Sequence, residues 1–242
     1  MRTNGTLRGI LLDLDGTIAD SIEFFYGLAC EVLGAANCEP PDRREVLHAI
    51  ANGIVPHERF LPADFPDRDA FLAGLYRDQW PSWIRRYGTE VEPLAGAVET
   101  VHALARRGLR LALVTSSSGP LPFLDRWGIR DAFSAIVARD NVRRIKPDPE
   151  AVLLALERLA LGPTEVLNIG DTPLDVRAGL AAGVATVGVL TGAGTEEQLR
   201  EAGASPILRS LAEVPDFLDR AFSDKDAEEC DMRRSAPRSM KS

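Results

Sequence analysis

Short apolar runs alternate with amphipathic stretches along most of the chain. The runs have apolar residues at successive positions, which is typical of parallel strands buried on both faces. The amphipathic stretches 97–107 and 150–161 are followed by Gly108 and Gly162, and glycine commonly ends a helix. This alternation predicts an α/β fold with a doubly wound parallel sheet. The predicted strands are Ile10–Leu14, Leu109–Val114, Ala135–Ala138, Val166–Ile169 and Ala185–Leu190.

Residues 20–92 interrupt this alternation of predicted strands and helices, because they contain helical patterns and no strand signal. An insert of about 70 residues is too long for a crossover connection and predicts a separate helical unit. We therefore expect a core domain of residues 1–19 and 93–222 and a small helical cap domain of residues 20–92. The tail from Ser223 has no aliphatic or aromatic anchor besides two methionines, which predicts disorder. The predicted cap helices are Ser21–Leu33, Arg43–Ala51 and Asp67–Tyr87.

The composition and charge of the chain disfavour several classes of function. The 242 residues are 45% hydrophobic and 26% charged, as in an ordinary globular protein. The net charge of −8 disfavours a partner such as nucleic acid or an anionic membrane. Asp13 interrupts the first apolar run, so that no signal peptide is expected and a cytoplasmic location is predicted. Three cysteines without CxxC spacing favour a reducing compartment and no zinc site. They are Cys30, Cys38 and Cys230.

Two aspartates follow the first predicted strand. Asp13 and Asp15 project the same way from an extended segment, and Gly16 then allows a sharp turn. Like charges this close repel each other unless a cation neutralises them or one carboxyl stays protonated. The pair could also be turn-forming carboxylates, although the apolar run before them indicates the end of a buried strand.

A second pair of aspartates lies in the sequence GDTPLD after the fourth predicted strand. Asp171 ends that strand, Thr172 is suited to N-cap a helix, and Asp175 falls in the first turn of this helix. A purely structural helix start explains Asp175 but not Asp171. If this strand adjoins the first, Asp13, Asp15 and Asp171 converge, and carboxylate oxygens suit Mg²⁺ rather than zinc.

Lysine usage singles out Lys146. The chain has 25 arginines and three lysines, and Lys146 is the only lysine before the tail. A compact ammonium on a flexible stem can reach a phosphate among carboxylates, a task that arginine performs differently. The alternative is that Lys146 is an ordinary surface lysine that is present by chance. Asp148 and Pro149 are suited to start a helix directly afterwards.

Other polar turns give weaker signals. Thr115–Ser117 places hydroxyls and N–H groups at a strand end, where they suit an anion, but serine-rich turns are common. Gly192–Glu197 lacks the third glycine of a dinucleotide fingerprint, so that a plain turn and N-cap is expected. The histidines form no local pair, and we expect them to be non-catalytic. They are His48, His57 and His102.

Four motifs in this order resemble the haloacid dehalogenase superfamily of phosphotransferases. They are DLDGT at 13–17, VTSS at 114–117, KPDP at 146–149 and GDTPLD at 170–175. The resemblance covers about residues 7–218. The insert looks like the helical cap of the phosphoglycolate phosphatase-like branch, and residues 176–204 are also similar to that branch. The resemblance implies a Rossmann-like core with a cap.

The resemblance also implies roles for the motif residues. Asp13 would accept the phosphoryl group as an aspartyl-phosphate, and Asp15 would protonate the leaving oxygen and later activate water. The implied phosphate-binding residues are Gly16, Thr115, Ser116 and Lys146. The implied Mg²⁺ ligands are Asp13, the backbone carbonyl of Asp15, Asp171 and, in support, Asp175. Mg²⁺ and Lys146 would offset the repulsion between a carboxylate and a phosphate dianion.

Related chemistries are disfavoured by particular residues. Dehalogenases of the superfamily lack the second acid, which is present here as Asp15. Phosphonate hydrolases use a cap lysine, and residues 20–92 contain none. Mutases of the beta-phosphoglucomutase type typically carry a cap histidine where this chain has Phe25 and an arginine where it has Pro56. A receiver domain is about half as long and has no cap.

These observations predict a Mg²⁺-dependent phosphatase that acts through an aspartyl-phosphate on a small phosphorylated metabolite, such as a phosphoglycolate-like or sugar-phosphate-like compound. A phosphosugar mutase and a non-catalytic phosphate-binding homologue are the alternatives. The metabolite and the oligomeric state do not follow from the sequence. The cap residues considered for substrate choice, all from one loop, are Asn52, His57 and Arg59.

Overall fold

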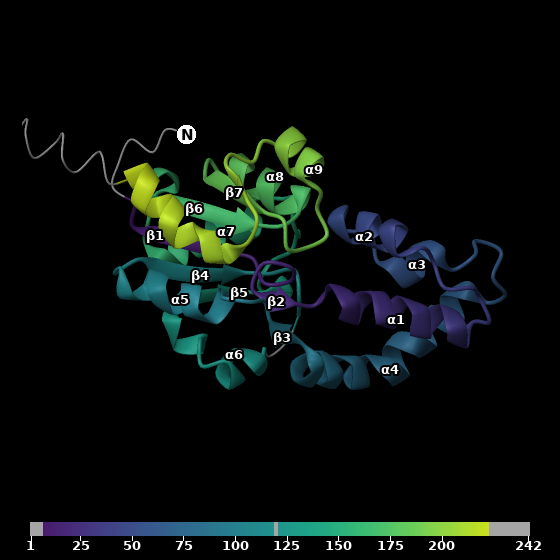
Figure 1. The fold of residues 1–242 in the computed structure, drawn as a ribbon. Coiled ribbons are helices and arrows are strands. Elements are labelled where there is room, and N and C mark those ends of the chain that lie inside the picture. The colour runs from purple at the N-terminus through teal and green to yellow at the C-terminus, as the bar shows by residue number, and fades with distance from the viewer. Residues whose placement is uncertain (1–6, 119–120, 223–242) are drawn as a thin grey trace, which may run out of the picture.

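A six-stranded parallel sheet forms the core of the computed structural model, which describes residues 7–118 and 121–222 (Figure 1). The strand order is β5–β4–β1–β6–β7–β8. All five predicted strands are present, which confirms the predicted fold class. β8 was not predicted, because two residues carry no readable pattern. The bounds are β1 (Gly9–Leu12), β4 (Arg110–Val114), β5 (Phe133–Val137), β6 (Val166–Gly170), β7 (Ala185–Val189) and β8 (Ile207–Leu208).

Helices cover both faces of this sheet. Side chains alternate along β1, so that Ile10 and Leu12 pack on one face and Leu11 packs on the other. The face of Ile10 is covered by α5 and by a helical segment at 214–222, and the face of Leu11 by α7 and α8. The core helices are α5 (Ala97–Arg106), α6 (Phe123–Arg126), α7 (Glu150–Leu159), α8 (Pro173–Ala181) and α9 (Glu196–Ala202).

Only one of the two glycines expected to end a helix does so. α5 is followed by Gly108, which has a φ of +77°, as the sequence predicts. α7 ends two residues earlier than predicted, because Ala160 adopts the left-handed conformation with a φ of +50°. The prediction that Gly162 stops this helix is therefore wrong.

Four helices between residues 22 and 90 form a unit beside the carboxyl ends of the core strands (Figure 1). They pack on one another through Leu28 and Val32 of α1 and Trp83 of α4. A short antiparallel ribbon of β2 and β3 joins this unit to the core. α3 and the ribbon were not predicted, because each is too short for a periodic pattern. The bounds are β2 (Ala19–Asp20), α1 (Ile22–Ala35), α2 (Arg43–Ala51), α3 (Pro56–Phe60), α4 (Arg68–Glu90) and β3 (Glu92–Pro93).

Two sequence-based expectations concern membranes and the tail. Within the described part of the chain, none of the helices combines the length and the apolar character that crossing a membrane requires. The predicted disorder from Ser223 onwards lies outside the described residues.

Candidate active site

Three neighbouring strands end at one edge of the sheet, and their polar residues meet there. β1 lies between β4 and β6, so that Asp13, Thr115 and Asp171 follow adjacent strands. The backbone N–H of Asp13 donates to Ile169 O (2.9 Å), which continues the β1–β6 pairing by one residue. This is the point where the strand order reverses, and it is the usual ligand-binding edge of a doubly wound sheet.

Lys146 joins two of the aspartates. Its Nζ donates to Asp13 Oδ1 (2.6 Å), Asp175 Oδ1 (2.6 Å) and Val114 O (2.7 Å), so that all three N–H donors are used. The side chain is only 6% exposed. Burial acts to lower the pKa of Lys146, but the charges of Asp13 and Asp175 outweigh it and raise this pKa. Lys146 is therefore a buried cation within the cluster rather than a surface residue.

Asp175 has a second set of partners in the first turn of α8. Its Oδ2 accepts hydrogen bonds from the N–H and the hydroxyl of Thr172 (3.0 and 2.6 Å), and Thr172 is the N-cap, as predicted. The predicted role of Asp175 in the start of this helix is thus seen in the structure, and its role at a metal site stays a prediction. The carboxylate completes a helix cap and also contacts Lys146.

Asp171 is enclosed by backbone. The N–H of Ala193 donates to its Oδ2 (2.9 Å), and the Thr17 hydroxyl donates to its Oδ1 (3.3 Å). A Cβ at Gly192 would overlap the Asp171 carboxylate, and a Cβ at Gly194 would overlap its backbone carbonyl. Sequence analysis treated this glycine pair as a plain turn. Its position after a neighbouring strand was the signal that it borders the site.

Asp13, Asp171 and Asp175 form a buried acidic cluster that could hold a metal ion, since one carboxylate oxygen from each lies within 4.8 Å of the others. Burial raises the pKa of Asp13 to about 7, and the charges of Asp175 and Asp15 add to this effect, while Lys146 opposes it. Burial and the charge of Asp175 also raise the pKa of Asp171 well above its usual range. Burial is thus the main cause of both shifts, and the like charges of neighbouring carboxylates add to it.

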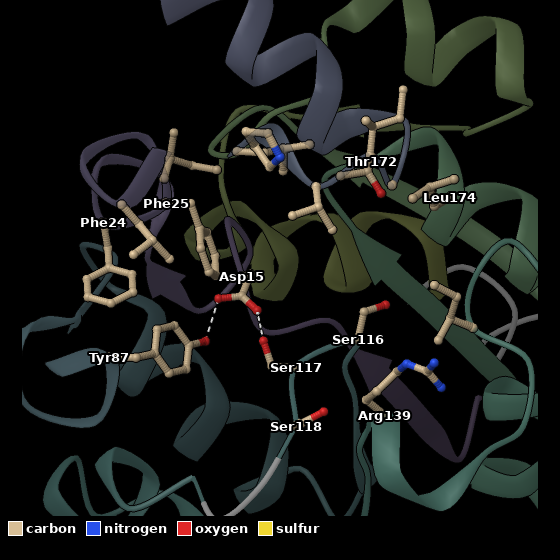
Figure 2. A pocket seen from close by; sticks show the side chains of 18 of the residues that line it. Asp15, Phe24, Phe25, Tyr87, Ser116, Ser117, Ser118, Arg139, Thr172 and Leu174 are labelled. Atoms are coloured by element: carbon tan, nitrogen blue, oxygen red, sulfur yellow. Dashed lines mark hydrogen bonds between the residues drawn. The ribbon is translucent and has the colours of Figure 1, made fainter. Parts of the chain in front are cut away.

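The carboxylate of Asp15 lies apart from this cluster. Its Oδ1 accepts a hydrogen bond from the Tyr87 hydroxyl (2.5 Å), and its Oδ2 accepts one from the Ser117 hydroxyl (2.6 Å) (Figure 2). The structure brings Asp13 and Asp171 together as expected, but the third carboxylate of the cluster is Asp175 rather than Asp15. Tyr87 belongs to α4 and was missed from the sequence.

The other predicted phosphate-binding residues lie at the same edge. Ser116 lines the cavity, whereas Thr115 is not among the lining residues and its Oγ1 accepts a hydrogen bond from Ser117 N (3.0 Å). Gly16 turns the chain with a φ of +79° and packs against Asp171. The role of Thr115 and Gly16 in phosphate binding stays a prediction.

A cavity of about 460 Å³ opens between the aspartates and helices α1–α4. His57 lines it and is buried, and its Nε2 lies 3.0 Å from the Tyr76 hydroxyl. Asn52 and Arg59 are not among the lining residues. The Asn52 amide donates to His48 O instead, and the Arg59 guanidinium lies over the Phe60 ring. Of the three residues considered for substrate choice, only His57 faces the cavity.

Known proteins share this architecture. A family model described as haloacid dehalogenase-like hydrolase matches residues 10–189. The chain is 30% identical to N-acetylmuramic acid 6-phosphate phosphatase of Pseudomonas aeruginosa, over 90% of this chain and 97% of that protein. It is also 30% identical to phosphoglycolate phosphatase of Escherichia coli strain K12, over 77% and 82% of the two chains.

A solved structure agrees with these relatives. CbbY from Rhodobacter sphaeroides, determined in complex with phosphate, superposes with a TM-score of 0.70 at 27% identity, over 86% of this chain and 96% of that one. The family match covers five of the six strands of the core sheet, the helical unit and all four motifs at the site, and it ends before β8. The chain therefore belongs to the haloacid dehalogenase-like hydrolases and is a phosphatase of that family.

Proposed function

We propose that the protein is a Mg²⁺-dependent phosphomonoesterase with Asp13 as its nucleophile. The observation that carries this proposal is the position of the Asp13 carboxylate, which lines the cavity and is fixed by Lys146 beside Asp171 and Asp175. Attack by Asp13 on phosphorus would form an aspartyl-phosphate and release the alcohol. A covalent intermediate divides one difficult displacement into two easier ones.

The acidic cluster fits a divalent cation. It combines three carboxylates with one lysine, so that two negative charges stay unbalanced when all of these groups are ionised. Oxygen donors from carboxylates are the ligands that Mg²⁺ prefers. Asp13, Asp171 and the backbone carbonyl of Asp15 would hold the ion, with Asp175 in support. When bound, Mg²⁺ would offset the charge of the carboxylates and of the incoming phosphate.

Lys146 and the loop after β4 would bind the phosphoryl oxygens. Lys146 already contacts Asp13, so that its ammonium lies where a phosphate attacked by Asp13 would arrive, and it would exchange one of its three present acceptors for a phosphoryl oxygen. Ser116 lines the cavity beside it and can donate a hydrogen bond. Thr115 would act by holding this loop in place. Because these groups are fixed before the substrate arrives, they would stabilise the transition state with little reorganisation.

Asp15 would act as the general acid and base. In the first step it would give a proton to the leaving oxygen of the alcohol. In the second step the resulting carboxylate would take a proton from the water that attacks the phosphorus of the aspartyl-phosphate. Tyr87 and Ser117 hold both oxygens of this carboxylate, so that its position at the cavity is defined before either step.

Helices α1–α4 would act as a cap over this site. They contribute one wall of the cavity, and the β2–β3 ribbon marks both points where the chain enters and leaves them. This assignment gives a core domain of residues 1–19 and 93–222 and a cap domain of residues 20–92. Closing such a cap over a bound phosphate would exclude bulk water from the phosphoryl group.

Hydrolysis of p-nitrophenyl phosphate tests this function. We expect release of inorganic phosphate that requires added Mg²⁺ and stops with excess chelator. A phosphosugar mutase would instead move the phosphoryl group between sugar positions, and Phe25, which stacks on Tyr87 at the cavity, offers no histidine for that reaction. Phosphate binding without phosphate release at any Mg²⁺ concentration would contradict the proposal.

A further inference from the structure

The cavity has two chemically different walls. The core wall carries all the lining residues with charged side chains, among them Lys146, Arg139 and the aspartates. The wall from α1–α4 carries none. Its lining residues, all between positions 22 and 87, have aliphatic or aromatic side chains apart from Gly53 and His57. They are Ile22, Phe24, Phe25, Leu28, Ile50, Gly53, Ile54, Val55, Pro56, His57, Tyr76, Trp80, Trp83, Ile84 and Tyr87.

Aromatic rings form a continuous part of the cap wall. Trp80 lies between Tyr76 and Trp83, with ring centroids 5.9 and 6.4 Å away, and His57 lies 5.9 Å from Trp83. On the other side of the cavity Phe25 stacks on Tyr87 at 5.7 Å. Figure 2 shows Phe24, Phe25 and Tyr87 on one side of Asp15, with Ser116 and Arg139 on the other.

More than half of the exposed large apolar side chains among the described residues line this cavity. The structure exposes seven of them among the described residues, and four line the cavity: Ile54 (42%), Val55 (40%), Trp80 (42%) and Ile145 (38%). A cluster of exposed apolar residues around a concave site is typical of a surface that binds an apolar ligand.

Glu58 and Arg68 of the cap are not among the residues that line the cavity. The Tyr76 hydroxyl donates to Glu58 Oε1, and the Arg68 guanidinium donates to Glu58 O. Since Tyr76 has one hydroxyl proton, its oxygen accepts from His57 Nε2–H, so that His57 can be neutral in this arrangement. Burial lowers the pKa of His57 and favours the same neutral form. The cap therefore offers no cation to an anionic group of the substrate.

We propose that the substrate is a phosphomonoester of a neutral, largely apolar alcohol with an aromatic ring. The inference rests on the proposed function and specifies its substrate class. The phosphoryl group would lie at Asp13 and Lys146, and the ring would pack between Trp80 and Phe25. A carboxylate or second phosphate placed against the cap wall would lose its hydration without a cationic partner on that wall, because the lining cations Lys146 and Arg139 belong to the core wall, which disfavours such substrates.

Three phosphomonoesters of primary alcohols test this substrate class. The phosphate is attached to a CH2 group in each of them, and they differ in the group beyond it. We expect kcat/KM for 2-phenylethyl phosphate to exceed that for ethyl phosphate about tenfold or more, since the ring is buried on the cap wall. We expect kcat/KM for 2-phosphoglycolate, in which a carboxylate replaces the methyl group of ethyl phosphate, to fall below that for ethyl phosphate. A 2-phosphoglycolate preference would overturn the inference while leaving the proposed function intact.

Trp80→Ala shows whether the cap wall causes the preference. Trp80 is half-exposed, so that its truncation should preserve folding, which a melting curve verifies. The ratio of kcat/KM for 2-phenylethyl phosphate over ethyl phosphate should fall about fivefold or more. Leu153→Ala is the matched control, because Leu153 is also exposed (49%) but lies on α7 away from the cavity. An unchanged ratio in Trp80→Ala would overturn the proposed binding mode.

Binding of phosphonates, which are not hydrolysed, tests the proposed substrate class independently of catalysis. Tryptophan fluorescence, titrated in the presence of Mg²⁺, should give a Kd for 2-phenylethylphosphonate about tenfold or more below that for ethylphosphonate. Equal affinities would overturn the inference. If none of the esters, p-nitrophenyl phosphate included, is hydrolysed, the proposed function fails, and the phosphonates still report which organic group the cavity accepts.

Discussion

The hydroxyl of Tyr87 donates a hydrogen bond to Asp15 Oδ1 across 72 residues of sequence, at 2.5 Å (Figure 2). Tyr87 lies on α4 of the cap and Asp15 on the loop after β1, so that this bond joins the two parts of the molecule at the proposed acid–base residue. Burial and the charge of Asp15 raise the pKa of Tyr87 well above its usual range, which keeps the donor protonated.

Tyr87→Phe removes this donor and leaves the ring packing in place. A hydrogen bond to a charged group contributes about 1.5–3 kcal/mol, but Ser117 still holds the other carboxylate oxygen. We therefore expect kcat to fall about tenfold with a smaller change in KM, because the loss concerns the orientation of Asp15 rather than substrate binding. Steady-state kinetics and a melting curve on one preparation measure both effects.

Tyr26→Phe provides the comparison for this variant. Tyr26 is on α1 in the same helical unit and does not line the cavity. It should keep wild-type kinetics. Equal kinetics in Tyr87→Phe and Tyr26→Phe would show that the bond to Asp15 has no role in the reaction.

Lys146→Arg tests whether the site needs a compact ammonium. Lys146 Nζ has three acceptors in three directions within 2.6–2.7 Å, and a planar guanidinium cannot donate to all of them from one point. Losing a charged donor at the reacting group costs about 3–4 kcal/mol of transition-state stabilisation. We expect kcat/KM to fall about a hundredfold or more.

Arg144→Lys is the reciprocal control on the same loop. Arg144 is 70% exposed and pairs with Asp148 and Glu150 outside the cavity. Exchanging one exposed cation for another should leave kcat/KM unchanged. The role given to Lys146 is wrong if both exchanges are tolerated equally.

Gly192→Ala tests the backbone enclosure of Asp171. A Cβ at position 192 would occupy the space of the Asp171 carboxylate, which would have to move. We expect weaker Mg²⁺ activation, measured as a higher Mg²⁺ concentration at half-maximal rate. Gly27→Ala is the control, because a Cβ there meets no atom within 4 Å. If Gly192→Ala keeps the wild-type Mg²⁺ response, Asp171 is not a ligand of the metal ion.

Stability near neutral pH should depend on His57. Burial lowers its pKa, so that the unfolded chain binds more protons than the folded one between this lowered value and the ordinary value of about 6.5. The contribution of neutral His57 is complete above about pH 6.5 and declines as the pH falls, by up to about 1.4 kcal/mol per pH unit. Urea unfolding of wild type and His57→Gln from pH 5 to 7.5 measures it. Parallel pH curves for the two proteins would contradict this assignment.

Local patterns were sufficient to predict the sheet and the strand-end residues. Apolar runs identified the five longer strands, and polar residues directly after them identified Asp13, Thr115 and Asp171. The unusual lysine count identified Lys146 without any structure. Each of these features is contained in a short segment, so that neighbouring residues alone reveal it.

Features that depend on packing between distant segments could not be predicted. Tyr87 contacts Asp15 only because α4 packs against α1 and the core. Gly192 packs against the Asp171 carboxylate only because the loop after β7 lies beside Asp171 in the fold. Ala160 ends α7 in the left-handed conformation, which glycine adopts far more often, so that residue type alone did not indicate it. The apolar cap wall combines residues from three separated stretches of the chain, 22–28, 50–57 and 76–87, and only the fold brings these stretches to one cavity.

Phosphorylation of Asp13 is the most direct test of the proposed mechanism, and Asp15→Asn makes it measurable. p-Nitrophenol leaves without protonation, so that the first step with p-nitrophenyl phosphate proceeds in this variant, while water attack on the aspartyl-phosphate lacks its base. Acid quenching and peptide mass spectrometry should find one phosphoryl group on Asp13, with a burst of about one p-nitrophenol per enzyme. Wild-type turnover with no burst and no phosphoryl group on Asp13 in Asp15→Asn would contradict the mechanism.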